Sequence, residues 1–461
     1  MMKTTKTKRA YSCDTFLAQG EATKSGKMLF GKNSDRYMGE AANVVYFPAK
    51  DYPAGSKLKI SQHEIEQAEH TNALLGLQPY YIWGLEIGVN EYGVSIGNEA
   101  EHSPVPPDIE GILGMDLVRL GLERGKTAEE ALNVITSLID KYSEGGVCSP
   151  DGPGADYNNT FIIADGKEAW VLETLRNQWV AKRIKDDCYT VSNTYWIEDD
   201  YDKCSDGIVA LAKEYGLAIK EEHFNFAKTF ALKGTDTDSF CITRRMRSME
   251  ILRRGFGKID VSYFMNMMRD HYEDNEVLKP RYDPANAVYM CLCFHGEPGI
   301  EFQTNSSLIV DYKGVDEDGN TKFAAWIGFN LPCCSTFFPI FGLDEIPEIL
   351  NGAGGKYDTE HLWWQLERMK LGIEANYNKY IELWRPYQRY FDGKSALLAS
   401  EVEIQKLGRE ERMEKLTQLL DEIAAACKTV YTKIEEDLAS GAPVEEHRAA
   451  YLEELKNRYM V

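Results

Sequence analysis

Residues 13–36, CDTFLAQGEATKSGKMLFGKNSDR, bring a cysteine, a short apolar segment and a polar cluster together in one stretch. The neighbours of Cys13 are small or polar, and Met28-Leu29-Phe30 predicts a short buried strand. That strand ends in a run of polar residues, 32–36, which reads KNSDR. If two strands pair here, the start of the first meets the polar end of the second. This pairing would surround the thiol with groups able to activate it.

The segment before Cys13 has two interpretations. Residues 1–12, MMKTTKTKRAYS, are basic and lack the apolar run that a secretory signal requires. A disordered tail is the simpler interpretation. In the alternative, the segment is a leader that is removed before Cys13. The α-amino group of Cys13, with a pKa of about 8, could then take the thiol proton without help from a histidine.

Composition limits the class of protein. The chain has 461 residues, is 43% hydrophobic and 27% charged, and carries a net charge of −21. These values predict a globular protein and argue against nucleic acid or an anionic membrane as partner. No apolar stretch is long enough to span a bilayer. The 10 cysteines, in a chain without a secretory signal, are typical of reduced thiols in a cytoplasmic protein.

Motif spacing predicts no metal and no cofactor. Cys291-x-Cys293 and Cys333-Cys334 lack the spacing of a zinc ribbon, and the scattered histidines form no HExxH. No G-x-G-x-x-G follows a strand and opens a helix, and no Walker A motif occurs.

The first half of the chain alternates between groups of strands and a pair of helices. Asp51 to Gln78 is expected to be a loop with a short excursion, and Thr127-x-x-Glu130 is a capping box before the second helix. Strands are predicted over 42–49, 80–90, 93–100, 160–165, 168–174, 178–184 and 188–193, and helices over 111–124 and 128–142. This order predicts an α+β layered fold rather than a doubly wound parallel sheet.

The second half ends in helices. We expect helices within 202–228, 242–254 and 265–272, strands over 289–295, 306–311 and 323–329, and helices again from 358, with a capped helix from Ser400 to about Leu438. We therefore divide the chain into a leader (1–12), a main domain (13–345) and a helical C-terminal region (346–461). The amphipathic helices of that last region would pack on the core or on a second copy, so a homo-oligomer is possible.

Several stretches, in order along residues 13–340, resemble one protein family. Residues 13–36 are similar to the start of the secernin and C69 dipeptidase family of N-terminal-nucleophile hydrolases. NEYGVSIGNEA (90–100), EAWVLET (168–174), YTVSNTYW (189–196) and ITRRMRSME (242–250) resemble later blocks of the same family. The resemblance implies a four-layer αββα sandwich, self-removal of the leader and attack on an amide carbonyl.

The resemblance also implies roles for individual residues. Cys13 would be the nucleophile and its freed amine the base, with Asp35 holding that amine. Asn193 would donate its side-chain amide to the oxyanion, and Asn98 would donate from its backbone. Arg244 would keep the site positive. We assign the charged neighbours of these residues to substrate binding: Lys32, Arg36 and Glu99. Lys32 stands where the related penicillin and bile-salt amidases carry an arginine, and a lysine cannot make the two-pronged hydrogen bond of that arginine.

The sequence thus predicts a cysteine hydrolase of small amide bonds, with dipeptides as the expected substrates and no cofactor. One alternative is a linear-amide or acyl amidase on the same scaffold. Another is a secernin-like regulatory protein with little catalysis. A thiol redox protein is disfavoured, because no C-x-x-C occurs.

Overall fold

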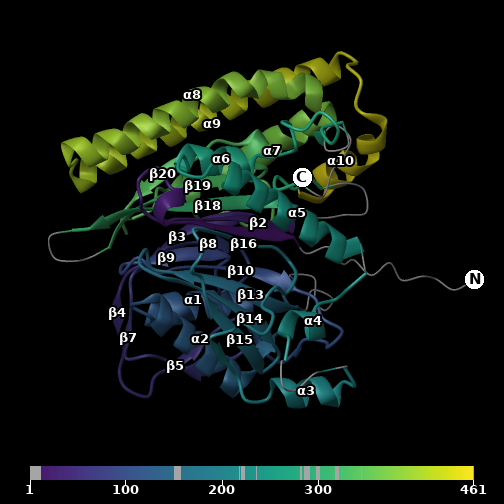
Figure 1. Cartoon of the computed structure of the whole chain (residues 1–461). Coiled ribbons are helices and arrows are strands. Elements are labelled where there is room, and N and C mark those ends of the chain that lie inside the picture. The colour runs from purple at the N-terminus through teal and green to yellow at the C-terminus, as the bar shows by residue number, and fades with distance from the viewer. Residues whose placement is uncertain are drawn as a thin grey trace, which may run out of the picture.

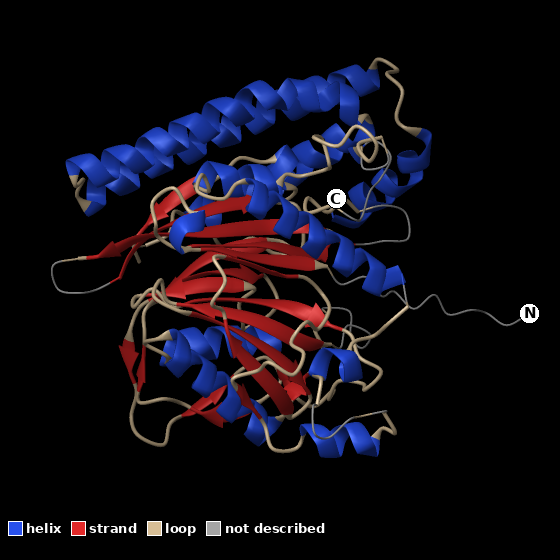
Figure 2. Cartoon of the chain, viewed as in Figure 1, coloured by secondary structure: helices blue, strands red, loops and turns tan. Residues whose placement is uncertain are grey.

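Two antiparallel sheets packed face to face form the centre of the protein (Figures 1 and 2). The structure is a computed structural model. It describes residues 12–149, 157–217, 219, 224–234, 236–280, 283–284, 291–296, 302–316, 321–343 and 345–459. Residues 1–11 of the predicted leader therefore lie outside the described residues.

The first sheet contains the cysteine-bearing strand. Its strands in spatial order are β16 (Cys188–Val191), β1 (Cys13–Ala18), β2 (Leu29–Tyr37), β18 (Phe302–Val315), β19 (Thr321–Phe329) and β20 (Phe338–Phe341). β1 and β2 pair so that Cys13 lies opposite Ser34. The predicted meeting of the chain start with the polar end of the second strand is therefore confirmed.

The second sheet is the larger one. Its strands in order are β17 (Lys203–Cys204), β15 (Gln178–Arg183), β14 (Ala169–Leu175), β13 (Asn158–Ala164), β10 (Ser95–Glu101), β9 (Ile87–Asn90), β8 (Leu74–Pro79) and β3 (Ala42–Phe47). Side chains such as Leu17 and Phe30 of the first sheet meet Leu75 and Ile162 of the second in one core. Both sheets are covered on both faces, so the central strands are buried along their whole length.

Helices cover the outer face of each sheet. α1 (Gly114–Arg124) and α2 (Ala128–Tyr142) pack on the second sheet, and α5 (Asp236–Arg254) and α6 (Val261–Met268) pack on the first. The capping box is confirmed in part, because Thr127 Oγ1 accepts the Glu130 N–H at 3.1 Å while Glu130 bonds to Lys126 N instead of the cap residue. Two smaller helices, α3 (Ile208–Glu214) and α4 (Phe226–Phe230), lie between β17 and α5 in the chain.

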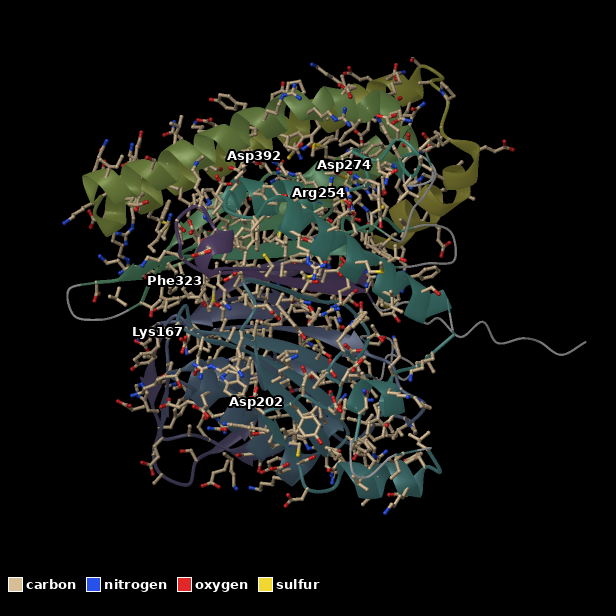
Figure 3. The ribbon with its side chains drawn as sticks, in the orientation of Figure 1. Lys167, Asp202, Arg254, Asp274, Phe323 and Asp392 are labelled. Atoms are coloured by element: carbon tan, nitrogen blue, oxygen red, sulfur yellow. The ribbon has the colours of Figure 1, made fainter. Side chains whose placement is uncertain are left out.

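The helical C-terminal region lies over the first sheet. It consists of α7 (Leu362–Ala375), α8 (Tyr377–Gln405), α9 (Arg409–Ala439) and α10 (Glu446–Tyr459). Its buried residues, including Trp363 and Ile423, belong to the same apolar cluster as the core between the sheets. Arg269, just after α6, binds Asp392 of α8 at 2.6 Å, and Asp392 is labelled in Figure 3. The prediction of an α+β, four-layer αββα sandwich with a helical C-terminal region is confirmed.

One strand prediction and one loop prediction in the first hundred residues were wrong in part, although residues 87–90 do form a strand. Residues 80–86 are not a strand, because the chain bends at Gly84, where a Cβ would come within 2.3 Å of the Met115 backbone. The predicted loop 51–78 instead carries the short strands β4 (Lys50–Asp51), β5 (Lys57–Lys59), β6 (Glu64–Glu66) and β7 (His70–Thr71), followed by β8. Their exposed polar residues hid the pairing.

Two predictions in the second half were also wrong. Residues 291–295 are not a strand, and 289–290 lie outside the described residues. Backbone groups of that segment bond to other partners, for example the Asn33 side chain, which donates to Leu292 O at 2.8 Å. Ser400 does not cap a helix, because the chain reaches it already helical in α8. The break comes later, at Lys406, whose φ is 50°. No helix among the described residues is long and apolar enough to cross a membrane.

Candidate active site

Cys13 is the first residue of β1, and both its backbone and its thiol are held. Its backbone N–H donates to Asn193 Oδ1 at 2.9 Å. Its Sγ accepts the Asp35 N–H at 3.3 Å and lies 3.8 Å from Asp35 O. The side chain is 7% exposed. The structure therefore places Cys13, Asp35 and Asn193 together, as the sequence predicted.

The thiol of Cys13 is neutral in this form of the chain. Burial raises its pKa to about 12, and the positive charge of Lys32 only partly offsets that effect. The nitrogen of Cys13 is here a peptide nitrogen joined to Ser12, so it cannot accept a proton. A nucleophilic thiolate would need a base to take the thiol proton. The peptide bond to Ser12 prevents the Cys13 nitrogen from serving as that base.

Lys32 reaches from the first sheet to the second. Its Nζ donates to Asn98 O at 2.5 Å and lies 3.6 Å from Glu99 Oε1. Burial acts to lower the pKa of Lys32, but the neighbouring Cys13, Glu99 and Glu86 outweigh burial and raise that pKa above its usual value. A fully buried ammonium is thus kept charged beside the thiol.

Glu99 faces the same interior as Lys32. Its Oε1 accepts the Thr15 hydroxyl, while Oε2 has no hydrogen-bond partner among the described residues. Burial raises the pKa of Glu99 to about 7. Glu99 therefore offers one carboxylate oxygen to a ligand placed between the sheets.

Asp35 carries a second buried carboxylate. Burial, reinforced by the charge of Asp14, raises the pKa of Asp35 to about 7, and the Ser12 and Thr304 hydroxyls beside it act in the opposite direction. The carboxylate thus lies beside the residue that precedes Cys13. A carboxylate there is close to the position that a free Cys13 amine would occupy.

Arg244 braces the start of β1 from α5. Its Nε donates to Asp14 Oδ2 at 3.0 Å, and its Nη2 donates to Ser192 Oγ at 2.8 Å and to Asn193 Oδ1 at 2.6 Å. The side chain is 1% exposed. Because one guanidinium holds the neighbour of Cys13 and the acceptor of its N–H, Arg244 sets their separation.

Two amide groups lie near the start of β1: the backbone amide of Asn98 on β10 of the second sheet, and the side-chain amide of Asn193, which follows β16 of the first sheet. Pairing of β10 with β9 stops at Gly97, so no strand among the described residues pairs with Asn98 on that side. Asn98 O and Ala100 O point to this side, because they accept Lys32 Nζ and Asn193 Nδ2. In a strand the N–H and C=O of one residue point the same way, so the Asn98 N–H faces the site too.

Asn193 is held by both ends of its amide. Its Oδ1 accepts from Cys13 and Arg244, and its Nδ2 donates to Ala100 O at 2.8 Å. A side-chain amide has two N–H groups, and among the described residues only one of those of Asn193 is used, so the other can serve a ligand. The Asn98 side chain has a different task and donates to Asn159 Oδ1 at 2.7 Å.

Arg36 lies near the site, but its guanidinium is already bound by other residues of the protein. It lies two residues beyond Ser34 on the same face of β2. Its guanidinium contacts Glu40 at 2.8 Å, Glu86 at 3.3 Å and the Tyr81 hydroxyl. Glu86 in turn accepts the Ser34 hydroxyl at 2.5 Å. This geometry indicates that Arg36 positions neighbouring side chains such as Glu86 more than it binds a substrate.

Sequence reasoning missed the partners of the predicted residues. Asp14 was missed although it lies beside Cys13 in an apolar strand, where a buried carboxylate needs a cation. Ser192 and Glu86 carried no signal, because their positions matter only once the strands are paired. A further group, His271, Cys293, His295 and Cys333, gathers in a different part of the fold.

Two antiparallel sheets between helical layers, with a cysteine at the first residue of an inner strand, match the four-layer architecture that the family resemblance implied. The chain belongs to peptidase family C69, whose model matches residues 12–390. The match extends past residue 340, where the resemblance read from the sequence ended, and includes α7 and part of α8.

Curated relatives of similar sequence include two proteins from Streptococcus pyogenes serotype M3, strains ATCC BAA-595 / MGAS315 and SSI-1. Each is described as a probable dipeptidase B and is 26% identical over 308 residues. The matched region covers 59% of this chain and 59% of the relative.

Solved structures of similar fold include a mutant of a conjugated bile acid hydrolase from Clostridium perfringens, with a TM-score of 0.41 and 15% identity. It covers 74% of this chain and 95% of that one. Penicillin V acylase from Agrobacterium tumefaciens has a TM-score of 0.40 and 13% identity. The matched region covers 71% of this chain and 86% of the acylase chain. A shared fold does not by itself carry a shared function.

Asp35→Asn tests the buried carboxylate through stability. The folded chain retains a proton on Asp35 up to a pKa of about 7, whereas the usual value is 3.8. Between those values the folded state binds more protons, so the contribution of Asp35 to stability falls as pH rises, while asparagine does not titrate. We expect the Tm advantage of Asp35→Asn to grow from about pH 5 to about pH 8.

Both proteins in this comparison carry Cys13→Ala, and their intact mass is used to check that residue 12 is attached in each. The measurement is thermal unfolding across the pH range. A Tm difference independent of pH would show that Asp35 titrates normally.

Proposed function

We propose that the protein is a cysteine hydrolase of small amide bonds, acting on dipeptides, with Cys13 as nucleophile after residues 1–12 are removed. The observation that carries this proposal is the hold on Cys13 at the start of β1: Asn193 Oδ1 binds its backbone nitrogen at 2.9 Å while its sulfur lies against Asp35. Membership of a peptidase family, with the family match beginning at residue 12, supports it.

Leader removal would create the base. Cleavage before Cys13 converts its peptide nitrogen into an α-amine with a pKa of about 8. Asn193 Oδ1 remains in place to accept from that amine, and the Asp35 carboxylate lies beside the position that Ser12 leaves. The amine takes the thiol proton, and the Lys32 charge favours the resulting thiolate.

The hydrolysis then follows two steps. The Cys13 sulfur forms a bond to the substrate carbonyl carbon, and the oxyanion accepts from the Asn98 N–H and the second N–H of Asn193. Collapse breaks the C–N bond, the Cys13 ammonium protonates the leaving amine, and a thioester remains. Water, deprotonated by the same amine, attacks the thioester and releases the acid and the thiol.

A small zwitterionic substrate fits the charges around the thiol. The unpaired Oε2 of Glu99 can accept the substrate's α-ammonium group, and Lys32 lies on the other side of Glu99. We assign substrate binding to Glu99 and Lys32. We expect Arg36 to act indirectly, by positioning Glu40 and Glu86.

Cys13→Ala tests the nucleophile. We expect hydrolysis to fall by roughly 10³-fold or more, because no other group can form the thioester, with the fold retained. Cys188→Ala, a buried cysteine on the neighbouring strand β16, is the matched control and should keep its activity. Turnover of dipeptides and acyl amides is measured for both. Unchanged turnover by Cys13→Ala would reject the assignment, and turnover of acyl amides alone would favour the amidase alternative.

Asn193→Ala tests oxyanion stabilisation and the positioning of the amine together. We expect kcat to fall by roughly 10²–10³-fold with a small change in KM, because the lost contacts act mainly in the transition state. Asn72→Ala is the control: Asn72 is equally buried, but it bonds to Leu122 O and Gly125 O at the end of α1, so only stability should fall. A pure rise in KM would contradict this role.

A further inference from the structure

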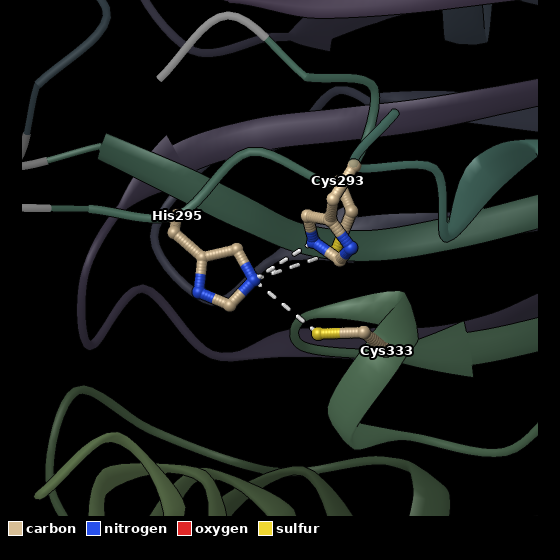
Figure 4. Close-up of side chains that lie close together, drawn as sticks. Cys293, His295 and Cys333 are labelled. Carbon is tan, nitrogen blue, oxygen red and sulfur yellow. Dashed lines mark hydrogen bonds between the residues drawn. The ribbon is translucent and has the colours of Figure 1, made fainter. Parts of the chain in front are cut away.

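Four side chains of types that bind metals lie close together on the outer, helix-covered face of the first sheet, away from the residues assigned to catalysis. His271, Cys293, His295 and Cys333 place one ligand atom each so that all four atoms lie within 4.8 Å of one another. In Figure 4, dashed lines run from one ring nitrogen of His295 to its neighbours, including the sulfurs of Cys293 and Cys333. All four are buried, with exposures of 2%, 0%, 0% and 8%.

The four residues come from three separate segments. His271 follows the end of α6, Cys293 and His295 lie in the segment 291–296, and Cys333 is in the short helix η4 (Pro332–Cys334). This explains why the sequence predicted no metal site. The ligands are spread over more than sixty positions, in a spacing that matches no common zinc motif.

The distances fit a tetrahedral ion. His271 Nε2 lies 3.1 Å from His295 Nε2, which lies 3.3 Å from Cys333 Sγ and 3.8 Å from Cys293 Sγ. Zinc bonds of about 2.05 Å to nitrogen and about 2.3 Å to sulfur, at tetrahedral angles, separate two nitrogens by about 3.3 Å and a nitrogen from a sulfur by about 3.6 Å. The three separations from His295 Nε2 are close to these values, and every other pair of ligand atoms lies within 4.8 Å.

Carboxylates orient both imidazoles toward the centre. His295 Nδ1 lies 3.2 Å from Glu374 Oε1, and His271 Nδ1 lies 2.9 Å from Glu273 Oε1. If each Nδ1 donates to its carboxylate, both Nε2 lone pairs face each other at 3.1 Å, which repels unless a cation lies between them. A carboxylate behind each histidine is the usual outer support of a metal ligand.

A single proton shared by the two histidines would relieve their repulsion, but it would not explain why two sulfur atoms lie beside the same nitrogen. Both thiols converge on the same nitrogen that the other imidazole approaches, in a site without exposed side chains. Two thiolates and one divalent cation sum to zero charge, which suits burial better than two isolated charges. Glu374 is itself balanced by Lys370 at 3.4 Å and Arg448 at 2.9 Å.

We propose that His271, Cys293, His295 and Cys333 bind a structural zinc ion. Two thiolates and two imidazoles in tetrahedral array select Zn²⁺ over harder cations such as Mg²⁺ or Ca²⁺. Four protein ligands leave no open position, so the ion would hold the fold together and would not activate water.

The ion would tie the segment 291–296 to the catalytic sheet. Asn33 of β2 donates to Leu292 O at 2.8 Å, and Phe294 exchanges hydrogen bonds with Thr304 of β18 at 2.8 and 3.0 Å. Thr304 is paired with Asp35 in the sheet. Through Glu374, on α7, the same centre also links the C-terminal helices to this sheet.

The first test is the metal content of the untagged, full-length protein after passage through a chelating resin. We expect about one zinc per chain, measured by inductively coupled plasma mass spectrometry, and retained in Cys13→Ala because the catalytic thiol is not a ligand. A protein that contains no zinc and takes up neither Zn²⁺ nor Co²⁺ would overturn the proposal. A Cys293–Cys333 disulfide, seen as two missing thiols of the 10 in the denatured unreduced protein, would also overturn it.

The second test assigns the ligands. Cys293→Ser and Cys333→Ser should lower zinc content at least several-fold and lower Tm. Cys291→Ser, a buried cysteine two positions away and outside the cluster, should keep the zinc. Zinc retained by both ligand variants would contradict the assignment. If those variants fail to fold, the cobalt-substituted wild-type protein still decides the matter: tetrahedral d–d bands with sulfur-to-cobalt charge transfer are expected, and an octahedral spectrum would overturn the site.

Discussion

The buried pair between Arg244 and Asp14 is the contact on which the site depends. One guanidinium, fixed on α5, binds the residue beside Cys13 and the amide that accepts the Cys13 N–H. Removing either partner would leave the other charge buried and unpaired, which typically costs about 3–5 kcal/mol. The start of β1 is therefore set by the helical layer as well as by its own sheet.

Burial favours the protonated forms of Cys13, Asp35 and Glu99. It raises the pKa of Cys13 to about 12 and holds Asp35 and Glu99 near 7, while Lys32 stays charged. Under the proposed function, one cleavage supplies the missing base without moving any strand. A zinc ion beside β2 and β18 would keep this preorganised arrangement rigid.

The sequence predicted much of this arrangement, because local patterns carry it. The apolar run Met28-Leu29-Phe30 predicted a buried strand ending in the polar cluster 32–36, and the family resemblance pointed to Asn98 and Asn193. What failed depends on tertiary contacts: the bend at Gly84 follows from the backbone of α1, and Ser400 looks like a cap only if the preceding residues are not helical. Partners such as Asp14 and the four-residue metal cluster become visible only after distant segments are brought together.

The central claim is that Cys13 works as a free N-terminal residue. Its most direct test is the intact mass and N-terminal residue of the purified protein, measured with its hydrolysis of dipeptides. We expect activity in proportion to the fraction of chains that begin at Cys13. A protein that hydrolyses dipeptides at full rate with residues 1–12 still attached would contradict the claim, because its Cys13 nitrogen would have no lone pair free to take the proton.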